Sequence, residues 1–236
     1  MDGVVASLRA FYGPLAPPPH EIFAFFVWDV VSARALPARR DVAWQALKRV
    51  PALTPDAMFR ASKADLESAL SAVGAVEQRI EALKNGSGHF RRHRELGARV
   101  RGPLAGAVRA LIDVPHLTAG ARIRGLLFAG GHALAPVDDE VARVLARLQG
   151  FESGSKARVR REGRRRLFQA CHGERDRIAE AVVVLAHHAA HACLEHAPHC
   201  AVCPLAADCR RMPVAASARR STPAARGQTP FWPQSE

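Results

Sequence analysis

Four cysteines lie close together near the end of the chain, and their spacing could hold one metal centre. They follow the pattern Cys-x6-Cys-x2-Cys-x5-Cys within seventeen residues, whereas the fifth cysteine of the chain lies apart. Four thiolates on a short segment suit a soft metal, either a structural zinc ion or an iron–sulfur cluster. Zinc sites generally pair two Cys-x2-Cys knuckles, and this segment holds only one. The four proposed ligands are Cys193, Cys200, Cys203 and Cys209.

Histidines crowd the same region, and two of them have the spacing of metal ligands. His187 and His191 are four residues apart, which places them on one face of a helix. No His-Glu-x-x-His motif accompanies them, so we interpret the pair as ordinary surface or core residues. The remaining cysteine, Cys171, falls within a helical pattern and is interpreted as a small buried hydrophobic residue.

The charge of the chain predicts a polyanionic partner. The net charge is +12, and only four of the 34 basic residues are lysines. A basic protein of this kind is expected to bind nucleic acid, here double-stranded DNA. The densest basic run spans residues 156–166. On a helix, Arg161 and Arg165 share a face that suits DNA phosphates, although a solvated helix face explains the same run.

Two features predict a cytoplasmic protein with reduced thiols. The first residues lack the basic and apolar regions of a signal peptide. The most apolar run, Ile22–Val31, is too short to span a bilayer and contains Asp29. We therefore expect a cytoplasmic monomer without a membrane partner, associated with the nucleoid if it is bacterial. Reduced thiols in that compartment disfavour disulfides in the cysteine segment.

The elements that must position these residues are predicted to be helices. Apolar residues recur with a 3.6-residue period along nearly the whole chain, without sustained alternation of strand type. The sequence thus predicts an all-α fold of about ten helices. Proline and glycine mark linkers at 13–20 and 150–156. Residues 211–236 have little to bury and are expected to form a disordered basic tail.

The cysteine spacing resembles the 4Fe–4S loop of endonuclease III and its relatives, which are helix–hairpin–helix DNA glycosylases. A second segment resembles the hairpin of that family. Val114-Pro115 and Leu117 match the apolar frame of the hairpin, and Asp138 lies eighteen residues after Gly120. The same interval separates the family's hairpin Lys from its catalytic Asp. The resemblance therefore implies that Asp138 assists catalysis, and it extends over most of the chain.

The resemblance also implies a domain organisation. It predicts the two-domain endonuclease III-like fold, in which residues 32–150 form a helical bundle with the helix–hairpin–helix. Residues 1–31 together with 151–210 would form the iron–sulfur cluster domain. The 4Fe–4S cluster would be a structural cofactor, and duplex DNA would lie in the cleft between the domains.

The hairpin of this chain departs from the family pattern at three positions. His116 and Thr118 replace two glycines that let backbone N–H groups approach a phosphate, and Gly120 replaces the catalytic Lys. Glycine cannot form the Schiff base through which bifunctional members cleave the strand. The resemblance therefore implies little or no lyase activity. The hairpin residues expected to face DNA are His116, Leu117, Thr118, Gly120 and Arg122.

A further segment, residues 30–35, resembles the family's Leu-Leu-Ser-Ala-Gln-Ala. Arg34 stands where that Gln fills the gap left by a flipped base, and an Arg could fill it by stacking and hydrogen bonding. Asp29 falls where adenine-excising relatives keep a catalytic Glu that protonates the departing base. The alternative is that Asp29 is a polar residue on an apolar helix, paired with Arg34.

These observations predict a base-excision repair protein, with a monofunctional DNA glycosylase as the leading function. Such an enzyme hydrolyses the N-glycosidic bond of a damaged or mispaired base that has been flipped out of the duplex. The alternative is a non-catalytic or weakly active paralogue that binds DNA or lesions, which the three missing hairpin residues favour. The third alternative, a bifunctional glycosylase and AP lyase, ranks last.

Overall fold

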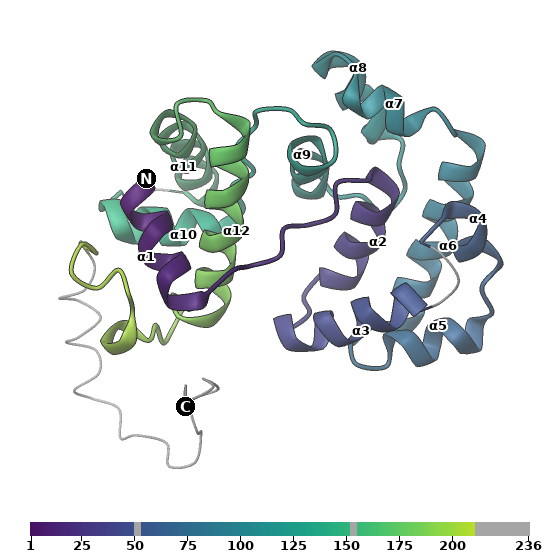
Figure 1. The fold of residues 1–236 in the computed structure, drawn as a ribbon, viewed down its shortest axis with the longest axis horizontal. Helices are drawn as coiled ribbons and strands as arrows, with labels where there is room; N and C mark the ends of the chain where they lie inside the picture. Colours follow the sequence, from purple (N-terminus) through teal and green to yellow (C-terminus); the bar gives the residue numbers. More distant parts are fainter. Residues whose placement is uncertain (50–52, 152–154, 211–236) are drawn as a thin grey trace, which may run out of the picture.

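The computed structural model describes residues 1–49, 53–151 and 155–210. Within these ranges the chain forms α-helices, one 3-10 helix and no strand, which confirms the predicted all-α class. The tail predicted at 211–236 lies outside the described residues. The helices are α1 (Asp2–Tyr12), α2 (Ile22–Ser32), α3 (Pro37–Arg49), α4 (Pro55–Arg60), α5 (Lys63–Leu70), α6 (Val76–Arg92), α7 (Leu96–Arg101), α8 (Leu104–Ile112), α9 (Ala119–Phe128), α10 (Asp139–Gln149), α11 (Lys156–Ala170), α12 (Arg175–His191) and η1 (Cys200–Val202) (Figure 1).

Side-chain caps set where several of these helices begin. Thr54, Ser62 and Ser155 each accept a hydrogen bond from the backbone N–H three residues later. Each bond satisfies a donor that the first turn of a helix leaves open. At the end of α10, Gly150 has a φ of 72°, a left-handed conformation that glycine adopts without strain.

The helices form two bodies, and the chain passes between them more than once. In one body, α10 packs on α11 and α12, and α1 packs on α12. In the other body, α2 packs on α3, α6 and α7, and α4 and α5 pack on α6. Helix α9 contacts α2, α8 and α12, so it lies between the two bodies (Figure 1).

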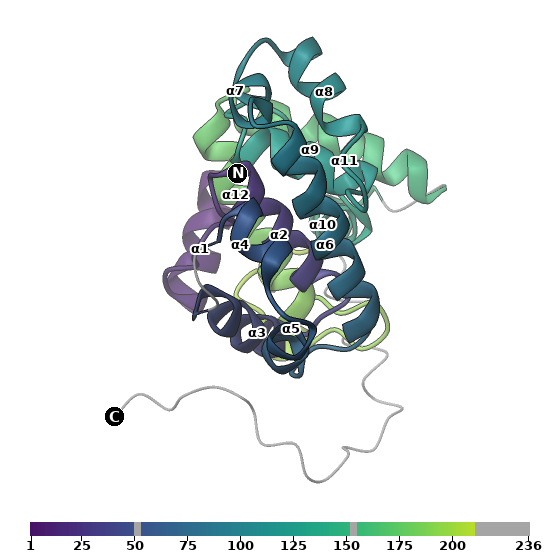
Figure 2. The same ribbon diagram turned by 90° about the vertical axis from the view of Figure 1, so that its right-hand side faces the viewer.

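The two turned views agree on the arrangement of the larger body. Helices α7 and α8 lie at one end of it, and α3 and α5 lie at the other (Figure 2). The long helix α6 runs between these ends beside α2. The larger body thus consists of one continuous stretch of chain, whereas the smaller body combines α1 with the last three α-helices.

This packing favours domain boundaries that differ from the predicted ones. Helix α2, which we placed with the cluster domain, packs in the larger body, and α10, which we placed in the bundle, packs on α11 and α12. The physical reason lies in α2, which is apolar on nearly all sides. Phe25, Phe26 and Val27 are fully buried, and only a surrounding bundle can cover such a helix.

The contact between α2 and α6 requires a glycine. A Cβ atom at Gly86 would stand 2.1 Å from the ring of Phe26, so a larger residue would displace that ring. This close approach keeps α2 in the middle of the bundle. The position of α2 matters because it carries both Asp29 and the segment that leads to Arg34.

The predicted linker after α1 is present. Residues 13–21 form no helix and cross from the smaller body to α2 (Figure 1). Part of the second predicted linker, residues 152–154, lies outside the described ranges. Among the residues that the structure describes, none of the helices is both long and apolar enough to cross a bilayer.

Candidate active site and cysteine loop

Asp138 caps α10 and remains open to solvent. Its Oδ1 accepts a hydrogen bond from the backbone N–H of Val141 at 2.9 Å, as expected for an N-cap residue. The Asp138 side chain is 44% exposed. The cap fixes the carboxylate at the start of the helix, where the helix dipole favours its negative charge. Asp138 is therefore held in place and accessible to a ligand.

Arg124 brings the two predicted catalytic carboxylates together. Its Nη2 donates a hydrogen bond to Asp29 Oδ1 at 2.7 Å, and its Nη1 lies 3.7 Å from Asp138 Oδ2. Asp29 lies on α2, Arg124 on α9 and Asp138 at the start of α10. Helix α2 thus converges with the consecutive helices α9 and α10 on one cluster of charges, which we call the carboxylate site.

The pairing of Asp29 differs from the one that the sequence suggested. We considered Arg34 as its partner, but Asp29 is bound to Arg124. The reason is geometric, because Arg34 lies beyond the end of α2 in an exposed turn, whereas Asp29 is 8% exposed and faces the neighbouring helix α9. A buried carboxylate requires a close cationic partner, and Arg124 provides one.

Sequence reasoning missed Arg124, whose role becomes visible only from its place in the fold beside Gly120 and Asp29. Gly120 falls where the resemblance places the family's Lys, and Arg124 follows it by one helical turn on the same face of α9. A Cβ atom at Gly120 would lie 3.7 Å from Nη1 of Arg124, which is an ordinary contact. The guanidinium therefore lies beside the place that a side chain at position 120 would enter.

A third acidic residue, Glu140, interacts electrostatically with Asp138 and Arg124 of the carboxylate site. The pKa of Glu140 is raised, chiefly because neighbouring protein displaces water from its carboxyl group and then because of the charge of Asp138. The positive charges of Arg143 and Arg124 act in the opposite direction. The raised pKa of Glu140 therefore reflects chiefly its loss of contact with water and, to a smaller extent, the acids beside it at the start of α10, whose effect Arg124 partly balances.

The hairpin keeps a left-handed backbone residue despite the loss of its glycines. His116 has a φ of 61°, a conformation that costs a non-glycine residue free energy. Its Nε2 lies 3.3 Å from Nδ2 of Asn85 on α6, and its side chain is otherwise exposed. Leu117 is buried beneath the hairpin. The hairpin thus holds a left-handed residue at a position where the resemblance leads us to expect glycine.

The second substituted glycine has acquired a structural role. The Thr118 side chain accepts a hydrogen bond from the N–H of Ala121 at 3.2 Å and caps α9. On the same helix, Arg122 donates to the carbonyl of Ile112 at 2.9 Å and so links α9 to α8. Thr118 and Arg122 thus stabilise the helix–hairpin–helix, and Gly120 is exposed beside them.

A buried arginine that the sequence did not reveal holds the end of α2. Arg79 on α6 is 7% exposed and donates to the carbonyls of Val31 at 3.1 Å and Ala33 at 2.5 Å. Burial lowers its pKa. These carbonyls are acceptors that the end of a helix leaves open. The next residue, Arg34, has a φ of 54°, so Arg79 supports a strained and exposed turn.

Two arginines of α10 hold the start of the cysteine loop, which we define as residues 193–209. Arg143 donates to the carbonyl of Cys193 at 2.9 Å and to that of Ala189 at 3.1 Å. Arg147 donates to the carbonyls of Leu194 at 2.6 Å and Glu195 at 2.7 Å. The helix that begins at Asp138 therefore also positions the loop through its next two turns.

The four loop cysteines are partly buried, and the thiol groups lie in a polar setting. The Cys203 sulfur accepts from the N–H of Leu205 at 3.4 Å, and the Cys193 sulfur lies 3.5 Å from Nη1 of Arg147. Burial raises the pKa of Cys203, and negative charge on the other three loop cysteines would raise it further. All four thiols are therefore near enough to interact electrostatically.

The donor chemistry of the loop fits an iron–sulfur cluster, although the side chains do not form a closed site. Four thiols with N–H groups directed at two of their sulfurs match the ligands and hydrogen bonds that such clusters use. Within the described ranges, however, no group of three or more histidine, cysteine or acidic side chains is arranged to hold a metal ion.

The histidines beside the loop pack with an aromatic ring. The rings of His187 and His191 stack at 3.9 Å, and Tyr12 packs edge-on against His187. Burial lowers the pKa of His187 and of His188 to about 4, so both are neutral at pH 7. This packing agrees with our interpretation of His187 and His191, and Cys171 is buried in the core as expected.

Part of the basic face of α11 is paired within the protein. Arg165 and Arg166 both bind Glu162, and these bonds lower the pKa of Glu162 to about 2. Arg165 also donates to Gln169 at 2.7 Å. Arg161 is exposed on the same helix. Of the two predicted phosphate contacts on α11, Arg165 is thus partly neutralised, whereas Arg161 faces solvent.

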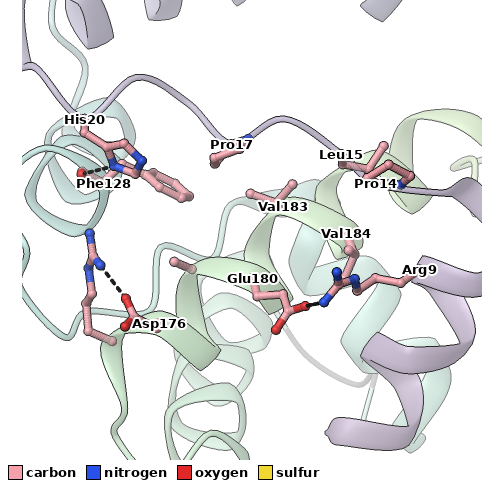
Figure 3. Close-up of a pocket in the computed structure, with 12 residues that line it drawn as sticks. Arg9, Pro14, Leu15, Pro17, His20, Phe128, Asp176, Glu180, Val183 and Val184 are labelled. Atoms are coloured by element: carbon pink, nitrogen blue, oxygen red, sulfur yellow. Dashed lines mark hydrogen bonds and ion pairs between the residues drawn. The ribbon is translucent and has the colours of Figure 1, made fainter.

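A pocket of about 270 Å³ lies between the linker, the end of α9 and α12 (Figure 3). His20 contacts the carbonyl of Phe128 at 3.2 Å on one side, and Arg9 pairs with Glu180 on the other. None of the predicted site residues lines this pocket. Its walls join the linker to α12, so we assign it to the packing between the two bodies.

Comparison with solved structures identifies the fold. A trapped endonuclease III–DNA covalent intermediate, an estranged-adenine complex, is 18% identical with a TM-score of 0.66, over 93% of this chain and 96% of that chain. The chain has the endonuclease III fold. A non-covalent endonuclease III–DNA complex is 16% identical with a TM-score of 0.67, over 94% and 97% of the two chains.

A third structure extends the comparison beyond endonuclease III itself. A thermostable thymine-DNA glycosylase is 16% identical with a TM-score of 0.63, over 90% of this chain and 96% of that chain. No protein-family model and no curated protein matches the sequence. The endonuclease III fold, with its two-domain all-α architecture, thus confirms the resemblance that the cysteine spacing and the hairpin indicated.

Proposed function

We propose that this protein is a DNA glycosylase of base-excision repair that hydrolyses the N-glycosidic bond of a damaged or mispaired base. The observation that carries the proposal is the carboxylate site on an endonuclease III fold. Asp138 is capped, 44% exposed and held beside Arg124 and Asp29. The similar structures include a thymine-DNA glycosylase and endonuclease III bound to DNA, which supports the same function.

Asp138 has the properties that the proposed reaction requires. Breaking the bond between sugar and base leaves positive charge on the deoxyribose, and a fixed carboxylate stabilises that charge without reorganising. The same carboxylate can accept the proton of the water that adds to the sugar. The cap to Val141 fixes one oxygen of Asp138, and its exposure leaves the group accessible to a flipped nucleotide.

We further propose that the enzyme is monofunctional. A lyase of the endonuclease III type requires an amine at position 120, and glycine stands there. The nearest cation is the guanidinium of Arg124, which does not lose its proton and therefore does not form a Schiff base. Borohydride treatment of the wild-type protein with abasic DNA is expected to give no covalent complex.

The proposed partner is duplex DNA, bound on the side of the carboxylate site. Arg34 lies in an exposed, strained turn that suits insertion into the duplex, and the left-handed His116 would let the hairpin backbone approach a phosphate. The exposed Arg161 would add an electrostatic contact. The proposed cofactor is a 4Fe–4S cluster held by the four loop cysteines, which would stabilise the loop and thereby α10.

A panel of duplexes with different lesions and mispairs tests this proposal. Wild-type protein is expected to release at least one base, and Asp138→Asn is expected to release it at least about a hundredfold more slowly. Binding to a duplex with a tetrahydrofuran abasic analogue should change little, because Asp138 acts on the reacting sugar. The proposal would be overturned if no duplex in the panel lost a base.

The neighbouring Asp139 provides a matched control. It lies one residue away, is exposed and pairs with Arg160 on α11 rather than with Arg124. Asp139→Asn removes the same charge from the same end of α10. We expect it to keep near-normal base release, and equal losses in the two variants would show that net charge, not the position of Asp138, supports the reaction.

A further inference from the structure

Arg124 has donors left after it binds the two carboxylates. An arginine carries five N–H donors, and Asp29 is the one hydrogen-bond acceptor that Arg124 reaches within the described part of the chain. Asp138 lies at 3.7 Å, which is an ion-pair distance but longer than a hydrogen bond. The Arg124 side chain is 27% exposed. Its remaining donors can therefore reach a nucleotide that Asp138 contacts.

The same contact changes the role open to Asp29. Its carboxylate accepts a charge-assisted hydrogen bond from Arg124 at 2.7 Å in a buried position. In this arrangement Asp29 acts as the anion that holds a guanidinium, and it is not arranged to donate a proton to a departing base. The group that a base would meet beside Asp138 is thus a cation with N–H donors.

We propose that Arg124 stabilises the negative charge of the departing base, so that the site excises bases that leave as anions. This inference rests on the proposed glycosylase function and specifies its substrate class, the 2-oxopyrimidines such as uracil. Purines, which leave readily only after protonation, would be poor substrates. A guanidinium held before the reaction begins acts on the departing base as an oxyanion hole acts on a developing oxyanion.

The reaction balances without any further reagent. The bond between C1′ and N1 breaks, and its electron pair moves into the pyrimidine ring, where the charge spreads to O2. Arg124 donates a hydrogen bond to that oxygen. Water adds to C1′ and passes one proton to Asp138, which then releases it to solvent, and the departed base takes one proton from solvent. The products are a hydroxyl-bearing abasic sugar and the neutral base.

Three duplexes test this proposal by single-turnover base release. They carry uracil, 5-fluorouracil or a mispaired adenine, and 5-fluorouracil is the best leaving group because its anion is the most stable. Wild-type protein should release 5-fluorouracil fastest, then uracil, and adenine negligibly. Arg124→Met should slow the release of uracil by about a hundredfold. It should slow the release of 5-fluorouracil less, because that base needs less stabilisation.

Two further variants separate this role from a structural one. Arg124→Lys keeps the positive charge and should recover part of the uracil activity. Arg177→Met removes another Arg–Asp pair, a more exposed one with Asp2 in the smaller body, and should leave the rates unchanged. All variants should bind a duplex that contains a tetrahydrofuran abasic analogue with nearly equal affinity. The substitution of Arg124 would then change the rate of base release and not the affinity for DNA.

Each outcome decides between the two proposals. Equal slowing of uracil and 5-fluorouracil in Arg124→Met would mean that Arg124 only maintains the fold, and it would overturn the inference. Release of adenine without uracil would overturn the inference and leave the glycosylase function standing. Failure to release any base would overturn both. If Arg124→Met does not fold, Arg124→Lys must show the same dependence on the leaving group.

Discussion

The cysteine loop and the carboxylate site differ in how their residues are brought together. The cysteines fall within one short segment, so their spacing is visible in the sequence, and arginines from α10 bind carbonyls at the start of that segment. Asp29, Arg124 and Asp138 come from three helices and meet only in the folded chain. The spacing of the cysteines in the sequence indicated the fold, whereas the charged groups of the carboxylate site are brought together only by the packing of helices.

The largest expected effect concerns the loop. Cys203→Ser should abolish iron binding, because a cluster of this kind requires four thiolate ligands. The visible absorbance and iron content of the purified protein measure this loss. Cys171→Ala is the matched control, since Cys171 lies in the core away from the loop and should leave the iron content unchanged. If the purified wild-type protein is colourless and contains one zinc ion, the loop binds zinc and the assignment of an iron–sulfur cluster is wrong.

The next effect concerns the carboxylate site and is a gain of function. Gly120→Lys should produce a borohydride-trapped complex with abasic DNA that the wild-type protein lacks. A side chain fits at position 120, and the neighbouring guanidinium of Arg124 disfavours the charged form of the amine, which leaves it nucleophilic. Gly120→Ala should give no complex. Absence of trapping in Gly120→Lys, with DNA binding intact, would mean that position 120 does not face the sugar.

The smallest expected effect concerns the support beneath the carboxylate site. Arg79→Met should lower the free energy of unfolding by about 3 kcal/mol, because carbonyls at the end of α2 lose a buried donor. Urea unfolding measures the change. Arg91→Met, on the same helix, removes a half-buried ion pair with Asp56 and should cost only about 1 kcal/mol. Similar costs for the two variants would contradict the role assigned to Arg79.

The sequence predicted the helical class, the linker after α1 and the resemblance to endonuclease III correctly. These features follow from periodicity, proline content and local spacing, which need no knowledge of the tertiary structure. The cap formed by Asp138 was also predictable, because an Asp before a helical pattern is a local signal.

Arg124 and Arg79 could not be found in the same way. Both are arginines in a chain that is rich in arginine, and nothing local distinguishes them from exposed residues. Their roles depend on carboxylates and carbonyls of α2, at least 46 residues away along the chain. The pairing of Asp29 with Arg34 was wrong for the same reason, because the partner of Asp29 is Arg124, which lies 95 residues away along the chain.

The division of the chain between the two bodies has a consequence for how the protein is made. The larger body is one continuous stretch, so it can fold as soon as that stretch has left the ribosome. Helix α1 is synthesised before this stretch, yet its partner α12 is synthesised more than 160 residues later. During translation α1 therefore waits without its partner, and Asp138 and the cysteine loop reach their final support only after α12 and the loop itself have been made.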